Sequence, residues 1–365
     1  MFRAVILCVM LAAMVLPSRA APLEADRLQQ KLETVREETG LVALGAVVAD
    51  ADGNILGLAV AGERVKGSRD AVQPGDAWHI GSNTKMLTAL LYGRLVEQGK
   101  ASWGATLPEL LPDLADEMDP AWNDVTIEHL LSHRSGLAAN PGMMWFLTSR
   151  ASSDPVETQR TKLAKGFLAK PPDGETGTFT YSNLGYIIAG AAIDRIAARQ
   201  GYENYEALFL STLVPNGEGW GFGPPKEGLE GHTKNLFGRL KGQGKGLNAD
   251  NPAALAPAGT LHVPLAAHAR FLSQFLHPAA IYGKLMTPYP DSTSDYALGW
   301  AVGQHDTLGR YYRHAGSNTI WLSHVTLLPE QGLVIIVNTN QHSEQAGEAM
   351  HELAVALAED LRAAY

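Results

Sequence analysis

A serine and a lysine three residues apart open a predicted helix in the stretch HIGSNTKMLTALL, and this is the only Ser-x-x-Lys spacing in the chain. Because residues three apart share one face of a helix, the Ser82 hydroxyl and the Lys85 amine are expected within hydrogen-bond reach. A serine hydroxyl becomes a good nucleophile when a neighbouring base takes its proton, and a lysine whose pKa is lowered by burial can be that base. The alternative is that Ser82 only caps the helix and Lys85 is an ordinary solvated residue.

Two further groups of residues could complete such a site. Tyr181 and Asn183 form a Tyr-x-Asn on a predicted loop that follows PPDGETG. His314 and Gly316 form a His-x-Gly on a predicted strand near the C-terminus, and Ser317 follows them. A glycine inside a strand lets another segment or a substrate approach the backbone closely.

These three motifs, in this order, resemble the signatures of the serine β-lactamase and penicillin-binding-protein superfamily. The resemblance is to its class C β-lactamase-like branch, with Ser-x-x-Lys at Ser82–Lys85, Tyr-x-Asn at Tyr181–Asn183 and Lys/His-x-Gly at His314–Gly316. The stretches LLSHRSGL, APAGTLH and YALGW are also similar to this family, so the resemblance covers nearly the whole chain after the first residues. The branch includes D-alanyl-D-alanine carboxypeptidases, D-amino-acid peptidases and esterases. A motif set of this kind is a hypothesis that the structural context must support.

The resemblance implies a role for each candidate residue. Ser82 would attack a carbonyl and become acylated, while Lys85 and Tyr181 would share the proton transfers; which of the two is the resting general base stays open. Asn183 would hold the substrate amide or the lysine amine. Backbone N–H groups of Ser82 and Ser317 would form the oxyanion hole, which needs two donors aimed at one point.

His314 is a departure from the Lys-Thr-Gly that is typical of class C β-lactamases and carboxypeptidases. Its titratable imidazole replaces a permanent charge, which weakens the expectation of efficient β-lactam turnover. The His-x-Gly form fits the esterase and peptidase members better. Ile320 stands where relatives often have a glycine, and Trp321 is expected in the core.

Other placements of these motifs, and a metal site, are less well supported. Tyr202–Asn204 lacks the Pro/Gly-rich approach and His79–Gly81 overlaps the serine motif, so both are interpreted as coincidences. His129 and His133 are four apart, a zinc-binding spacing on a helix, but no glutamate follows His129. The remaining histidines of the middle of the chain are expected on the surface or in loops: His232, His262 and His268. No metal and no cofactor are predicted.

The elements that must position these residues suggest an α+β fold. An amphipathic helix and two β-rich runs, LVALGAVVAD and ILGLAVAGE, precede the serine motif, while four β-rich runs and a closing amphipathic helix follow residue 295. Between them the chain is mainly helical, with a loop-like stretch from FGPPKEG to LNADNP. We therefore predict an antiparallel sheet built from both termini and flanked by helices, with an inserted mainly helical lobe. The sheet lobe is expected at about 22–78 and 290–365, and the helical lobe at about 80–288, within one hydrolase domain over 21–365.

Residues 1–20 have the form of a cleavable secretory signal peptide. Arg3 precedes an apolar run over 4–16, and small residues end the segment near Ala20. The only cysteine, Cys8, lies inside it, so the mature chain would have no disulfide and no thiolate nucleophile. The 365-residue chain carries 29 Lys and Arg against 38 Asp and Glu, and an acidic body without a basic stretch argues against nucleic acid or anionic membranes as partners. A secreted or periplasmic location, without membrane attachment after cleavage, is expected.

The sequence therefore predicts a secreted serine hydrolase that acts through an acyl-enzyme on a small amide or ester. A D-amino-acid peptide, a cell-wall fragment or an acyl ester would be the substrate, and weak β-lactam binding or hydrolysis is left open as a side activity. The alternative from another class is a catalytically inactive penicillin-binding-like module that binds wall peptides or a partner. A metallohydrolase is the third candidate, and the oligomeric state is left open.

Overall fold

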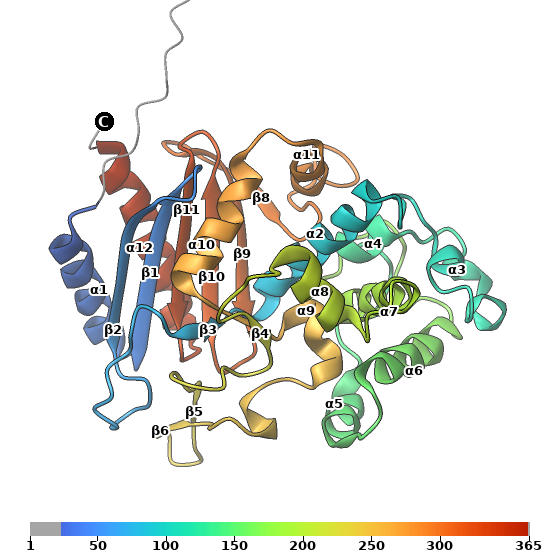
Figure 1. Ribbon diagram of the computed structural model, residues 1–365, viewed down its shortest axis with the longest axis horizontal. Coiled ribbons are helices and arrows are strands. Elements are labelled where there is room, and N and C mark those ends of the chain that lie inside the picture. The colour runs from blue at the N-terminus through green and yellow to red at the C-terminus, as the bar shows by residue number, and fades with distance from the viewer. Residues whose placement is uncertain (1–22, 364–365) are drawn as a thin grey trace, which may run out of the picture.

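The computed structural model describes residues 23–363, and within that range one antiparallel sheet of six strands carries the fold (Figure 1). The strand order is β2-β1-β11-β10-β9-β8, so strands from both ends of the chain meet where β1 pairs with β11. This confirms the predicted α+β class and the sheet built from both termini. The strands are β1 (Ala43–Asp50), β2 (Ile55–Gly62), β8 (Ala301–His305), β9 (Gly309–Ser317), β10 (Leu322–Leu328) and β11 (Leu333–Thr339).

Helices cover both faces of this sheet. The terminal helices α1 (Ala25–Thr39) and α12 (Glu344–Ala363) pack on one face, and α10 (Leu265–Ser273) packs on the other (Figure 1). As a result every residue of β1 is buried, which explains its nearly continuous apolar sequence. Helix α10 falls inside the range 80–288 expected for the helical lobe, yet it contacts β1, β2 and β11.

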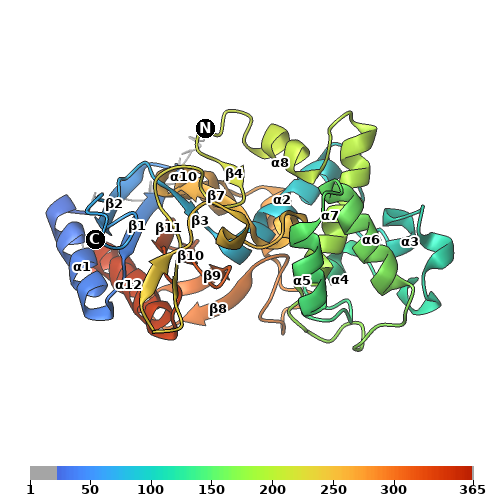
Figure 2. The same cartoon turned by 90° about the horizontal axis from the view of Figure 1, so that it is seen from below.

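The remaining helices form a second lobe beside the sheet, with α2 (Thr84–Glu97) between the two (Figure 2). Eleven of the fourteen residues of α2 are buried, because helices and sheet surround it. The other helices are α3 (Leu107–Leu110), α4 (Ile127–Leu131), α5 (Gly142–Ala151), α6 (Val156–Leu168), α7 (Asn183–Arg199), α8 (Tyr205–Leu213), α9 (Ala256–Gly259) and α11 (Ala280–Met286). Single 3₁₀ turns occur at η1 (Gly81–Asn83), η2 (Ala115–Glu117), η3 (Pro120–Trp122), η4 (Leu247–Ala249), η5 (Ala253–Leu255) and η6 (Gln274–Leu276).

One buried ion cluster joins three helices of this lobe. Arg160 of α6 is fully buried and donates to both carboxylate oxygens of Asp194 on α7 at 2.7 and 2.8 Å. It also donates to both oxygens of Glu206 on α8 at 2.9 Å. Because buried charges require such pairing, this cluster ties α6 and α8 to α7, the helix that begins at Asn183.

Short strands occur in the middle of the chain, where few were expected. β3 (Ala77–His79), β7 (Leu261–Pro264) and β4 (Gly221–Phe222) form a small sheet, and β5 (His232–Lys234) pairs with β6 (Leu240–Gly242). β5 and β6 lie inside the stretch predicted to be loop-like, and β4 ends at its first residue. These strands are two to four residues long, too short to give a periodic sequence signal.

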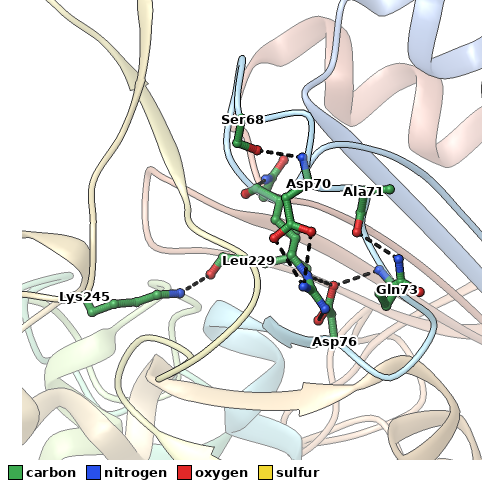
Figure 3. Close-up of polar contacts among 9 residues, drawn as sticks. Ser68, Asp70, Ala71, Gln73, Asp76, Leu229 and Lys245 are labelled. Carbon is green, nitrogen blue, oxygen red and sulfur yellow. Dashed lines mark hydrogen bonds and ion pairs between the residues drawn. The ribbon is translucent and has the colours of Figure 1, made fainter.

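The segment that leads into β3 is fixed by a charged cluster. Asp76 accepts hydrogen bonds from Nε and a terminal nitrogen of Arg64 at 2.9 and 2.8 Å, and from the backbone of Gln73 at 2.8 Å. Figure 3 shows Asp70 and Asp76 directed toward the same guanidinium group, with Lys245 reaching the carbonyl of Leu229 nearby. The cluster therefore fixes the segment before β3, outside the serine turn itself.

The predicted signal peptide and Cys8 lie outside the described residues. Between residues 23 and 363, none of the helices combines the length and the apolar character that a bilayer-spanning segment requires.

Candidate active site

Ser82 lies in a tight turn between a strand and a buried helix. β3 pairs with β7, Ile80 donates its backbone N–H to the Leu261 carbonyl at 2.9 Å, and the chain then enters η1. Gly81 has φ +52°, and a Cβ there would overlap the backbone of Ser317, so only glycine suits this position. The predicted helix start is thus displaced slightly: Ser82 is in the 3₁₀ turn, and α2 begins at Thr84.

Lys85 is completely buried, which excludes its interpretation as a solvated helix residue. Its Nζ lies 3.1 Å from Ser82 Oγ, 2.7 Å from Asn183 Oδ1 and 2.7 Å from the Ala258 carbonyl oxygen. Burial lowers the pKa of Lys85 well below its ordinary value of 10.5. A neutral amine has two N–H bonds and one lone pair. When Lys85 is neutral, the Asn183 and Ala258 oxygens accept these two N–H bonds, which leaves the lone pair for the Ser82 hydroxyl.

Tyr181 lies against the same amine. The Lys85 Nζ is 4.9 Å from the centroid of the Tyr181 ring. Burial raises the pKa of Tyr181 to about 12, although the adjacent Ser82 hydroxyl opposes the rise. Tyr181 is therefore a neutral phenol at physiological pH, a form that can donate a proton.

Asn183 is the first residue of α7 and faces Lys85. Its Oδ1 accepts the hydrogen bond from Lys85, and its Nδ2 donates to Asn140 Oδ1 at 2.8 Å. Ser182 is the N-cap of α7, with its Oγ accepting from the backbone of Gly185 at 3.0 Å. This cap fixes the helix end on which Asn183 stands. Of its two expected roles, holding the lysine amine is the one that the geometry shows.

β9 brings the His-x-Gly motif to the serine turn. Gly316 packs so closely that a Cβ would overlap the Ile80 carbonyl and lie 2.9 Å from the backbone nitrogen of Ser82. β8 pairs with β9 only as far as Arg313, so the edge of β9 beside His314 and Gly316 is not covered by β8. The structure thus brings Ser317 and Ser82 to adjoining backbone positions.

His314 is buried beneath this edge and carries no charge. Its Nδ1 donates to Asn83 Oδ1 at 3.2 Å, and burial together with the nearby Lys85 lowers its pKa to about 3. Asn83 Nδ2 in turn donates to Ser323 Oγ at 2.8 Å and to the Ser323 carbonyl at 3.1 Å. His314 therefore cannot present the permanent positive charge of a lysine at this position.

The three supporting stretches noted in the sequence all contact the site. In APAGTLH the Ala258 carbonyl accepts from Lys85. In LLSHRSGL the centroid of the His133 ring lies 4.2 Å from that of the Tyr181 ring, with the ring planes tilted by 38°. In YALGW a Cβ on Gly299 would lie 2.7 Å from the Cα of Met86. Each stretch therefore supports the site through a direct contact.

Sequence reasoning missed two histidines of the site. His133 stands out in the sequence only for its spacing from His129, but its Nδ1 accepts the backbone N–H of Ser182 at 3.0 Å, and its ring lies beside that of Tyr181. His79 belongs to the His-x-Gly interpreted as a coincidence, yet its Nδ1 accepts the N–H of Gly81 at 3.1 Å. Both are buried, and a histidine at a serine turn gives no sequence signal of its own.

The surface or loop placement of three other histidines was wrong. His232, His262 and His268 are all buried, the last within α10. Ile320 and Trp321 are buried, as expected for Trp321. His129 Nδ1 accepts the backbone N–H of Thr126 at 3.0 Å, a helix-capping contact. Across residues 23–363 no group of three or more His, Cys, Asp or Glu side chains gathers as metal ligands would.

A cavity of about 490 Å³ opens next to the candidate residues. Tyr181 and His314 line it together with Arg313 of β9, His324 of β10 and His351 of α12. A volume of this size suits a small ligand. A cavity of about 520 Å³ beside α5 and α6 contains none of the candidate site residues.

A family model described as Beta-lactamase matches residues 29–360. The chain belongs to the beta-lactamase family.

Three relatives have names that describe a hydrolase, an esterase or a penicillin-binding protein. Unguisins hydrolase ungD' of Aspergillus campestris is 24% identical over 76% of this chain and 55% of its own length. Penicillin-binding protein 4 of Amycolatopsis lactamdurans is 24% identical over 87% of this chain and 86% of its own length. Esterase EstB of Burkholderia gladioli is 35% identical over 52% of this chain and 50% of its own length.

Two solved structures share the fold of this chain. The octameric penicillin-binding protein homologue from Pyrococcus abyssi superposes with a TM-score of 0.74, at 21% identity, over 91% of this chain and 77% of its own. The D-alanine carboxypeptidase AmpC from Burkholderia cenocepacia superposes with a TM-score of 0.70, at 17% identity, over 91% of this chain and 98% of its own. The match to unguisins hydrolase and to EstB spans only about half of each relative's length.

Proposed function

We propose that this protein is a serine hydrolase that works through an acyl-enzyme on Ser82. The Ser82 Oγ attacks a substrate carbonyl carbon, and its proton passes to Nζ of Lys85 as the new C–O bond forms. The negative charge on the carbonyl oxygen is held by the backbone N–H groups of Ser82 and Ser317. Expulsion of the leaving group leaves an ester on Ser82, and water then hydrolyses that ester.

The contact between Lys85 and Ser82 carries this proposal. A buried amine with lowered pKa, 3.1 Å from a serine hydroxyl, is a nucleophile and base in contact. The opposite pKa directions favour Lys85 as the resting base, because Tyr181 remains a phenol up to about pH 12. Tyr181 then donates its proton to the leaving group and recovers it from Lys85 or the incoming water.

The substrate we propose is a small amide or ester, such as a D-amino-acid peptide, a cell-wall fragment or an acyl ester. The uncharged His314 supports an ester or peptide substrate over efficient β-lactam turnover, because it provides no fixed cation for a β-lactam carboxylate. The 490 Å³ cavity is lined by Tyr181 and His314 and not by Ser82 or Lys85, so it is a space beside the candidate nucleophile. The esterase and hydrolase names among the relatives support the same substrate classes.

We further propose that the protein acts outside the cytoplasm, after removal of residues 1–20. The main alternative remains a catalytically inactive module that holds wall peptides or a partner. The intact contacts among Ser82, Lys85 and Asn183 support catalysis, since a binding module needs no lysine buried at a serine.

A substrate panel tests this function. p-Nitrophenyl esters, D-amino-acid p-nitroanilides and a chromogenic cephalosporin are offered to the wild type and to Ser82→Ala. We expect turnover of an ester or D-amino-acid substrate that Ser82→Ala reduces by on the order of 10²-fold or more. Binding of wall peptides without turnover would support the inactive module. Loss of activity on treatment with a chelator would support a metallohydrolase.

A further inference from the structure

A buried carboxylate links the two turns that carry the candidate oxyanion donors. Asp250 lies between η4 and η5, and its side chain is almost wholly enclosed. One of its oxygens, Oδ2, contacts Nε2 of His79 at 2.8 Å. The other, Oδ1, accepts from Nδ2 of Asn318 at 2.9 Å and from the backbone of Asn251 at 2.7 Å.

The His79 side of this link fixes the serine turn. Gly81 donates its N–H to His79 Nδ1 at 3.1 Å, so the ring proton must be on Nε2, which donates to Asp250. The arrangement differs from a Ser-His-Asp triad, because the nitrogen opposite the carboxylate is occupied by a backbone amide. His79 therefore fixes the position of Gly81, the residue before Ser82, and takes no proton from Ser82.

The Asn318 side fixes the turn after β9. Asn318 Oδ1 accepts the backbone N–H groups of Ile320 and Trp321 at 3.2 and 3.0 Å, which closes a turn containing Thr319 at φ 72°. A threonine in the left-handed region is strained and needs such support. Asn318 directly follows Ser317, so these bonds constrain the backbone next to the residue that carries the Ser317 amide.

We propose that Asp250 is a positioning residue, which holds the Ser82 and Ser317 amides in register by bonding His79 with one oxygen and Asn318 with the other. The proposal rests on the serine hydrolase function above, because the relative position of the two N–H groups matters only if they stabilise an oxyanion. Two backbone donors from different elements give full stabilisation only when their convergence is maintained.

The hydrogen-bond pattern supplies a selective test. In Asp250→Asn the new side chain has one acceptor oxygen and one NH₂ group. Its NH₂ group must therefore face another donor, either the Nε2–H of His79 or the NH₂ group of Asn318. In the double variant Asp250→Asn/Asn318→Asp the donor and acceptor exchange places. The new amide at position 250 would accept from His79 through its oxygen and donate through its nitrogen to the new carboxylate at position 318. That carboxylate can still accept from Ile320 and Trp321, so the swap loses only the bond from the Asn251 backbone.

We expect Asp250→Asn to lower kcat/KM by about 10²-fold, the cost of one misplaced oxyanion donor, with KM changed by less than about threefold. Affinity for a boronic acid that forms a tetrahedral adduct should fall in parallel. The double variant should recover most of both losses. Asp76→Asn is the matched control: it removes a buried carboxylate of the segment before β3 and should lower the Tm without selectively lowering kcat.

Hydrogen exchange of peptides covering residues 79–84 and 315–322 gives a readout independent of turnover. Exchange should rise in Asp250→Asn in both peptides and return in the double variant. Unchanged exchange, failure of the folded double variant to recover, or a kcat loss that merely follows the Tm as in Asp76→Asn would overturn the proposal. Wild-type protein inactive on every substrate would instead contradict the serine hydrolase function, while the exchange data would still decide whether Asp250 joins the turns.

Discussion

Nζ of Lys85 lies 3.1 Å from Oγ of Ser82, at the end of a side chain that is fully buried. Burial disfavours the ammonium form and lowers the pKa of Lys85, and Asn183 and Ala258 accept the remaining N–H bonds. A residue that would be solvated in most helices is thus a buried amine of lowered pKa in contact with a hydroxyl. This relationship determines the expected chemistry and its pH dependence.

Replacing Lys85 with methionine should abolish most activity while preserving the volume of the buried chain. General-base catalysis contributes about 10²- to 10⁴-fold, so kcat/KM should fall within that range. In the wild type kcat/KM should rise with pH as Lys85 loses its proton and level off well below pH 10.5. Steady-state kinetics across pH measure both effects. A wild-type profile that is still rising near the ordinary lysine pKa would contradict a lowered Lys85 pKa.

The same pKa predicts how stability depends on pH. The folded pKa of Lys85 is below its unfolded value, so the unfolded chain binds more protons between the two values. The free energy of unfolding should therefore gain a contribution from Lys85 that rises with pH through this window and ends near pH 10.5. Urea titrations of wild type and Lys85→Met at several pH values should show this rise only in the wild type. An identical pH dependence of the free energy of unfolding in both proteins would contradict a lowered pKa of Lys85 in the folded state.

His314 should have no part in the pH dependence near neutrality. Its pKa is about 3, so the imidazole is uncharged at about pH 5 and above. His314→Gln keeps a donor for Asn83 and should lower kcat/KM by less than about tenfold without altering the form of the pH profile above about pH 5. Kinetics on one ester across pH check this. An acidic limb near about pH 6 that disappears in His314→Gln would show that the imidazole titrates there.

Gly316→Ala should damage both stability and activity. The added Cβ would overlap the Ile80 carbonyl and press on the backbone of Ser82, so β9 must move away from the serine turn. We expect a loss of about 1–3 kcal/mol in the free energy of unfolding, as for overpacking, and a loss of most turnover.

Gly166→Ala is the matched control, since Gly166 is exposed within α6 and a Cβ there meets nothing within 4 Å. It should raise stability by about 0.5–1 kcal/mol and leave kcat/KM unchanged. Denaturant unfolding and ester kinetics on both variants make the comparison. Full activity in Gly316→Ala would mean that β9 does not adjoin the serine turn as described.

The sequence was sufficient for the architecture because its signals are periodic and long. The apolar runs of β1 and β11 and the amphipathic patterns of α1 and α12 each reach seven residues or more, enough to identify the terminal sheet. Short elements such as β4 and β5 gave no such signal. The packing of α10 on the sheet depends on tertiary contacts, which no local pattern encodes.

For the site, the sequence identified residues within motifs and missed those that act through them. The motif residues gather around one point, and Gly81 beside Ser82 packs on Ser317: Ser82, Lys85, Tyr181, Asn183 and Gly316. His133, His79 and Asp250 come from separate segments and have no shared spacing. Burial could not be read from the sequence either, and it is burial that shifts the pKa values of Lys85, Tyr181 and His314.

The central claim is that Ser82 is a nucleophile activated by Lys85. The most direct measurement is mass spectrometry of the protein after treatment with a fluorophosphonate, followed by peptide mapping. The account predicts one adduct, located on Ser82, that is absent in Ser82→Ala and forms at least about tenfold more slowly in Lys85→Met. A folded protein that hydrolyses a substrate yet forms no adduct, or forms it on another residue, would contradict the claim.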